Sequence, residues 1–256
     1  MTPDIHSSVM GTLYKDARLK ANRAKKHIRC LEAAIFEMEE TYSSTIEHHP
    51  DTNAQTLKHE IPGVEDAFDR LSLIVGDVIH NLHCALDYAW YSTINRLLPD
   101  KVSDSTKFPV RKTREGVESA LRGIEVDTRC ERLFDCIMSD IQPYKGGHNE
   151  AIWTLHDLDI MDKHLVLLEF VPNAQIRGTV IRHESGEIFT GDTWAIQDCG
   201  PYRIDFAGGI EIKNKGKLSV AISFKEAGIW KGVSVLNLLQ SFSNFIPYVI
   251  KLLEDI

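Results

Sequence analysis

The sequence predicts an α+β protein that is mainly α: an antiparallel helical bundle with a small antiparallel β-sheet inserted before the C-terminal helix. Apolar residues recur with helical spacing over much of residues 1–164 and again at the C-terminus. Residues 165–229 instead contain short apolar runs separated by turn signals, a pattern typical of β-strands. We therefore expect a single domain, with the bundle in residues 1–164, the sheet in residues 165–229 and a closing helix in residues 230–256.

The helix predictions rest on apolar periodicity and on chain breakers. In residues 7–44, apolar residues alternate in steps of four and three, which predicts a long first helix with one packing seam. The seam consists of Ala24, Ile28, Leu31, Ile35 and Met38. Residues 47–63 are polar and contain Pro50 and Pro62, so a loop is expected there. Further helices are predicted at residues 64–98, at residues 149–164 and, as one or two short helices, at residues 115–141.

The predicted sheet begins with a continuous apolar run at residues 165–171, which suits a buried strand. Two turn signals follow, Ser185-Gly186 and Asn214-Lys215-Gly216, and each lies between two short apolar segments. The flanking segments are residues 176–181 and 187–190 for the first turn, and residues 209–212 and 218–224 for the second. We therefore expect two β-hairpins.

Composition excludes some classes of protein. The 256-residue chain has a net charge of −8, so no overall field favours nucleic acid or an anionic membrane. It has five cysteines without paired spacing and no signal peptide, which predicts free thiols and a cytoplasmic location. The apolar C-terminal segment, residues 232–253, is interrupted by polar residues and by Pro247, so we expect a core helix and no membrane span.

Positive charge is nevertheless concentrated near the start of the chain. Seven basic residues fall within the first predicted helix: Lys15, Arg18, Lys20, Arg23, Lys25, Lys26 and Arg29. Such a run is usually a solvated helix face, and the alternative is a track that meets phosphate.

The second predicted helix carries an unusual polar face. Between Ser72 and Asn95 it contains no Lys, Arg, Glu or Gln, the residues that normally cover a solvated helix. The face consists of Asp77, His80, Asn81, His83, Cys84, Asp87, Tyr88 and Tyr91. These residue types transfer protons, bind metals or form buried hydrogen bonds. The face therefore predicts either the wall of a functional site or a polar seam inside the bundle.

A second His/Asp cluster lies in the predicted helix at residues 149–164. His156, Asp159 and Lys163 share one face, with Asp162 beside Asp159. A carboxylate next to a lysine and a histidine can support acid–base chemistry or hold a phosphate. The alternative is an ordinary i, i+4 salt bridge between Asp159 and Lys163.

The two helices together supply the predicted site. The candidate catalytic residues are His80, His83, Asp87, Asp162, Lys163 and His164. His80, His83 and Asp87 are also candidate ligands of a divalent metal ion, the one cofactor that we consider. The zinc-protease pattern H-E-x-x-H is absent, as are the nucleotide-binding glycine loops and the G-x-S-x-G elbow.

Three motifs, in order, resemble those of an uncharacterised bacterial family. Members of this family carry G-(E/D)-x-x-H-N-L-R-S-A-L-D-H, then I-x-x-L-Q-P-Y, then L-x-x-L-x-x-x-D-K-H-R. The corresponding segments here are residues 76–88, residues 141–144 (Ile-Gln-Pro-Tyr) and residues 155–164. The resemblance covers about residues 71–165 and none of the predicted sheet.

The first of these motifs is in turn similar to HEPN domains, helical bundles that are often RNases. The HEPN pattern is an arginine followed, four to six residues later, by a histidine. Here His83 stands at the arginine position and Tyr88 at the histidine position. The resemblance implies an HEPN-like fold, whereas the two replacements argue against HEPN-type RNA cleavage. His80, Asp87, Asp162 and His164 would then perform different chemistry.

Two functions are compatible with these residues. The first is a hydrolase that acts on a small-molecule or nucleotide-like substrate, including a phosphodiester, with or without a metal ion. The second is a non-catalytic binding or assembly module, a homo-oligomer whose polar helix face is a structural network. Convergence of His80, His83, Asp87 and Asp162 on an open pocket would favour the hydrolase. Scattering of these residues, or their burial in the core, would favour the module.

Overall fold

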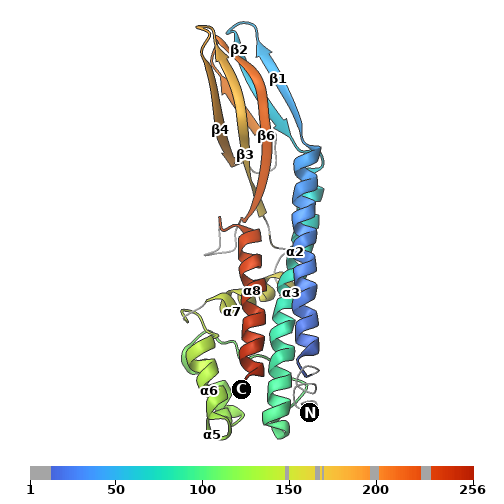
Figure 1. Ribbon diagram of the computed structural model, residues 1–256, viewed down its shortest axis with the longest axis vertical. Helices are drawn as coiled ribbons and strands as arrows, with labels where there is room; N and C mark the ends of the chain where they lie inside the picture. Colours follow the sequence, from blue (N-terminus) through green and yellow to red (C-terminus); the bar gives the residue numbers. More distant parts are fainter. Residues whose placement is uncertain (1–12, 148–149, 165–167, 169, 197–201, 226–231) are drawn as a thin grey trace, which may run out of the picture. The chain divides into compact units, whose positions relative to one another are not determined.

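The chain folds as an α+β protein, and the computed structural model describes residues 13–147, 150–164, 168, 170–196, 202–225 and 232–256 (Figure 1). The main helices are α2 (Lys15–Thr41), α3 (Val64–Leu97), α4 (Arg114–Gly123), α7 (Ala151–His164) and α8 (Val235–Glu254). Shorter helical segments are η1 (Pro99–Lys101), α5 (Val126–Arg129), α6 (Glu131–Asp135) and the π-helical turn η2 (Cys136–Ile141). The strands are β1 (Ser43–His49), β2 (Ala54–Glu60), β3 (Phe170–His183), β4 (Ile188–Ile196), β5 (Tyr202–Phe206) and β6 (Ile210–Phe224).

The structure divides into two compact units, and helices α2 and α3 contribute to both. The helical unit comprises residues 1–29, 74–167 and 237–256, and the sheet unit comprises residues 30–73 and 168–236. The predicted boundaries differ from these, because part of the segment assigned to the bundle belongs to the sheet unit.

The helical unit has its core on the apolar face of α3, opposite the polar face that the sequence predicts. All seven apolar residues of that face are at most 1% exposed: Val75, Val78, Ile79, Leu82, Ala85, Leu86 and Ala89. The period of 3.6 residues per turn puts them on one stripe, and burial of the stripe leaves the polar residues of α3 on its other side. The predicted helix at residues 64–98 is therefore confirmed, with α3 ending at Leu97.

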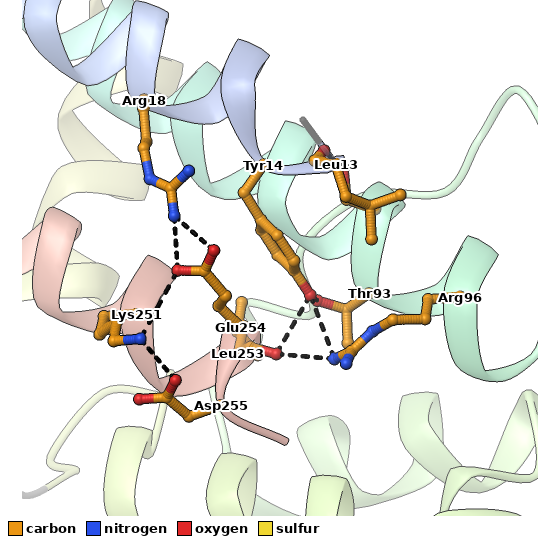
Figure 2. A network of polar contacts seen from close by, with 10 residues as sticks. Leu13, Tyr14, Arg18, Thr93, Arg96, Lys251, Leu253, Glu254 and Asp255 are labelled. Carbon is orange, nitrogen blue, oxygen red and sulfur yellow. Dashed lines mark hydrogen bonds and ion pairs between the residues drawn. The ribbon is translucent and has the colours of Figure 1, made fainter. Parts of the chain in front are cut away.

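A polar network fastens the C-terminal end of α8 to α2 and α3 (Figure 2). The Tyr14 hydroxyl, fully buried, donates to the Leu253 carbonyl at 3.1 Å and lies 2.9 Å from Thr93 Oγ1. Arg96 Nη2 donates to the same carbonyl at 3.1 Å. Because the last carbonyls of a helix have no partner within the helix, these donors cap α8 with side chains.

The sheet unit contains two antiparallel three-stranded sheets, ordered β1-β2-β5 and β4-β3-β6. Figure 1 shows the long strand β3 between β4 and β6. The last turn of α2 joins the second sheet, because the Glu39 carboxylate accepts hydrogen bonds from Val220 N at 2.7 Å and Ser219 Oγ at 3.0 Å. The predicted hairpin at Ser185-Gly186 is confirmed as the β3–β4 connection.

The predicted loop at residues 47–63 is wrong: most of it belongs to the β1–β2 hairpin. Asn53 has a φ of 51° and supplies the left-handed conformation that its turn requires. Leu57 and His59 are fully buried, and β2 pairs with both β1 and β5. The partner strand β5 is far away in sequence, so local polarity could not reveal this burial.

The predicted second hairpin is also wrong, because β6 runs without interruption through Asn214-Lys215-Gly216. Its pairing with β3 shifts register between Val180 and Ile181, opposite these residues, and Gly216 has a φ of 74°. The residues of the turn signal thus form an irregularity within a long strand, because β3 pairs with β6 on both sides of them.

Several predictions fall partly outside the described residues. These include the start of the first helix before residue 13, most of the strand at residues 165–171, and the segment at residues 226–231 that precedes α8. Within the described part of the chain, no helix is both long and apolar enough to cross a membrane.

Candidate functional site

The carboxylate of Asp159 on α7 lies at the centre of the polar contacts between α3 and α7. The Asp159 residue as a whole is 4% exposed. It accepts hydrogen bonds from Lys163 Nζ at 2.6 Å and from His80 Nδ1 at 3.3 Å. His83 Nδ1 lies 3.5 Å from its second oxygen. We call Asp159, His80, His83 and Lys163 the Asp159 cluster. In it, three basic side chains surround one buried carboxylate. Helical spacing keeps His80 and His83 on one face of α3, and Asp159 and Lys163 on one face of α7.

His80 is the most accessible member of the cluster, with 43% of its side chain exposed. Because a carboxylate can only accept hydrogen bonds, Nδ1 carries the proton and Nε2 of the neutral ring keeps its lone pair. The Cys84 Sγ lies 3.4 Å from this Nε2, and burial raises the pKa of the Cys84 thiol. An accessible imidazole whose tautomer is held by a buried carboxylate is the arrangement found in general bases.

His83 is more enclosed and contacts a second histidine. Its Nε2 lies 3.0 Å from His156 Nδ1, and the two rings stack with their centroids 5.2 Å apart. The carboxylates of Asp87 and Asp159 favour a proton on His83 Nδ1, so that Nε2 accepts the hydrogen bond from His156. Burial lowers the pKa of both imidazoles. A charge on His83 would lower the pKa of His156 further.

Asp87 connects the cluster to the segment that follows α3. Its Oδ1 accepts a hydrogen bond from Phe108 N at 3.0 Å. Burial raises the pKa of Asp87, while the neighbouring His83 opposes this change. Asp87 thus anchors the chain after η1 against the same helix that carries His80.

Close approach of α7 to α3 depends on Gly76. A Cβ atom at this position would lie 2.6 Å from Asp162 Oδ2 and 2.8 Å from Oδ1. Asp162 Oδ1 is buried and has no hydrogen-bond partner within the described part of the chain, and burial raises the pKa of this carboxyl group. Gly76, the first residue of the sequence motif, therefore makes room for a carboxyl group at the helix interface.

The structure brings together most of the predicted catalytic residues. His80, His83 and Lys163 surround Asp159, and Asp87 borders His83. Asp162 lies one turn along α7 against Gly76, and the side chain of His164 lies outside the described residues. The sequence prediction omitted Asp159 and His156 from the site. Their shared face with Lys163 was a signal, but only the packing of α7 on α3 makes Asp159 the centre.

The predicted metal site gains no geometric support. In the part of the chain that the structure describes, no group of three or more His, Cys, Asp or Glu side chains is placed to hold a metal ion. His80 contacts Asp159, whereas Asp87 accepts a hydrogen bond from Phe108. The metal site stays a prediction from the sequence, and elemental analysis of the purified protein beside its His80→Ala variant would test it.

The buried histidine pair predicts a loss of stability in mild acid. Because the pKa values of His83 and His156 are lowered in the native state, the unfolded chain binds protons first as the pH falls below about 6.5. The free energy of unfolding should therefore decrease from pH 7 to pH 5.5, as urea denaturation can measure. Asp87 and Asp162 have raised pKa values, so the folded state binds their protons before the unfolded state does. Their protonation increases the free energy of unfolding as the pH falls, and it occurs nearer the ordinary pH range of carboxylates.

A double variant tests this assignment. With His83→Asn and His156→Asn together, the decrease between pH 7 and pH 5.5 should become smaller. Replacing the exposed His48 by Asn should leave the decrease unchanged. An equal pH dependence in all three proteins would contradict the role given to the pair.

Comparison with known proteins adds no relative. No protein-family model, no curated protein and no solved structure matches this chain. Function must therefore be argued from the residues of the site itself.

Proposed function

We propose that this protein is a hydrolase in which His80 is the general base and Asp159 holds its tautomer. The observation that carries the proposal is the pairing of an accessible imidazole, 43% exposed, with a carboxylate that is 5% exposed and 3.3 Å away. Such a base removes a proton from an attacking water or hydroxyl group, which contributes about 10²–10⁴-fold to a rate. The helical unit would, on its sequence motifs, be an HEPN-like bundle.

Positive charge near His80 favours an anionic substrate such as a phosphodiester. Lys163 lies beside His80 across Asp159, with 35% of its side chain exposed. Lys20 on α2 is a second nearby cation. Burial raises the pKa of the Cys84 thiol, and the charge of Lys20 lowers it and so partly offsets the effect of burial. A developing negative charge on a phosphoryl oxygen would be stabilised by such cations.

Hydrolysis of two chromogenic esters tests the proposal: bis(4-nitrophenyl) phosphate, a phosphodiester, and 4-nitrophenyl acetate, a carboxylic ester. We expect turnover of the phosphodiester and a decrease of about 100-fold or more in His80→Gln. The matched control is His48→Gln, a change at an exposed histidine of the sheet unit, which should leave the rate unchanged. Absence of turnover with both esters, or equal rates in both variants, would contradict the proposal.

The burial of the other members favours a second candidate, the non-catalytic binding or assembly module. The side chains of Asp159 and His83 are only 5% and 12% exposed, and their polar contacts are with other residues of α3 and α7. In this case the cluster specifies how α7 packs on α3, and the protein associates with a second copy or another partner. His80→Gln would then reduce stability without affecting hydrolysis of any ester.

A further inference from the structure

A polar hollow lies in the helical unit, outside the Asp159 cluster. It has a volume of about 170 Å³ and is formed by the segment after α3 together with α4. Its lining combines three cations, three hydroxyl groups and an apolar floor: Lys101, Lys107, Arg111, Ser103, Ser105, Thr106, Trp90, Pro109, Ala120 and Ile124. The lining contains no acidic side chain.

The three cations differ in their ion pairing within the described residues. Lys101 pairs with Glu125 at 2.6 Å. Among the described residues, by contrast, neither Lys107 nor Arg111 forms an ion pair, and both are exposed. Like charges that converge on one hollow repel one another, and a bound anion relieves that repulsion.

The hollow is held in shape by backbone contacts. Phe108 N donates to Asp87, and Arg111 N donates to the Pro143 carbonyl at 3.2 Å. The Arg111 Nη1 donates to the Val110 carbonyl at 2.7 Å, which fixes the guanidinium and leaves its other donors available. Ser103 N also donates to Thr106 Oγ1 at 2.9 Å, which closes the hydroxyl-bearing turn.

We propose that this hollow is a binding site for a small tetrahedral oxyanion, a phosphate ion or the phosphoryl group of a small monoester. Arg111 and Lys107 would donate charge-assisted hydrogen bonds, and the serine and threonine hydroxyls would donate neutral ones. The apolar lining residues Trp90, Pro109, Ala120 and Ile124 lower the local dielectric and strengthen both kinds of contact. A volume of about 170 Å³ suits one phosphoryl group and excludes a polymer within the hollow.

Charge links the hollow to Asp87 and His156, which border the Asp159 cluster. Burial raises the pKa of Asp87 and lowers that of His156, and the charges of Lys107 and Arg111 make smaller contributions that lower the pKa of Asp87 and of His156 respectively. An anion that neutralises these cations should therefore raise the pKa of the His156 imidazole. This gives a readout of binding that does not depend on any enzymatic activity.

Calorimetric titration of the full chain with inorganic phosphate tests the proposal, with chloride at equal ionic strength as the reference. We expect saturable binding of phosphate, weakened about tenfold or more in Arg111→Gln and in Lys107→Gln. The control Lys112→Gln removes an exposed neighbouring charge outside the hollow and should bind phosphate like the wild type. An NMR titration should show a higher pKa for His156 when phosphate is present.

The outcomes separate the alternatives. Tighter binding of phenyl phosphate than of phosphate would assign the site to a monoester, and equal binding would assign it to the free ion. Heats that follow ionic strength alone, or saturable binding that survives both Arg111→Gln and Lys107→Gln, would overturn the proposal. Phosphate binding can be present without ester hydrolysis, so this result is independent of the proposed hydrolase.

Discussion

Replacing Asp159 by Asn should decrease the free energy of unfolding by about 2 kcal/mol at pH 7. Removing one partner of a fully buried ion pair costs roughly 3–5 kcal/mol, because the remaining charge is left uncompensated. The expected loss is smaller here because Lys163 and His80 are 35% and 43% exposed, so water can solvate them once Asp159 is neutral. Urea denaturation would measure the change.

The matched control is Asp157→Asn. Asp157 is on the same helix and acts on His156, but it belongs to no ion pair among the described residues. Its replacement should change stability much less. A second readout is the pKa of His83, which the charge of Asp159 raises against the effect of burial. In Asp159→Asn the pKa of His83 should therefore decrease, and equal losses of stability in the two variants would refute the central place given to Asp159.

The second large effect concerns Gly76. In an open helix, Gly76→Ala would stabilise the protein by about 1 kcal/mol, because alanine has the higher helix propensity. Here the added Cβ would lie 2.6 Å from Asp162 Oδ2, and overpacking of this kind costs roughly 1–3 kcal/mol. We expect a net destabilisation of about 1 kcal/mol or more, since the whole Asp162 carboxylate lies within 2.9 Å of the added Cβ and must leave its place at the helix interface.

A double-mutant cycle makes this prediction specific. In the Asp162→Ala background the clash is absent, so Gly76→Ala should become stabilising. Gly123 at the end of α4 is the control, because no heavy atom lies within 4 Å of a Cβ built there. If Gly76→Ala has the same effect with and without the Asp162 carboxylate, the two helices do not meet at this point.

Periodicity in the sequence was sufficient to predict the faces of α3. Its apolar stripe is buried as expected, and the polar residues His80 and His83 lie together on the other side. The spacing of Asp159 and Lys163 also predicted their salt bridge correctly. These are relations within one helix, and helix geometry makes residues three or four apart neighbours whatever the rest of the chain does.

The errors arose where the partner of a segment is distant in sequence. The β1–β2 hairpin appeared to be a loop because its residues are polar, yet β5 pairs with β2 and Leu57 is buried. The residues 214–216 appeared to be a turn, yet pairing with β3 extends the strand through them. Strand formation depends on the pairing partner more than on local preference, so single-sequence patterns are weak there.

Spacing along the chain was enough to identify the side chains that could take part in chemistry: histidines, carboxylates and lysines at helical spacing on residues 76–91 and 156–163. The packing of the helices was needed to show that these side chains gather around Asp159, and that Lys107 and Arg111 line a hollow and form no ion pair with any residue the structure describes. The physical reason is that spacing along a helix is fixed by local geometry, whereas burial and charge balance depend on which distant segments pack together.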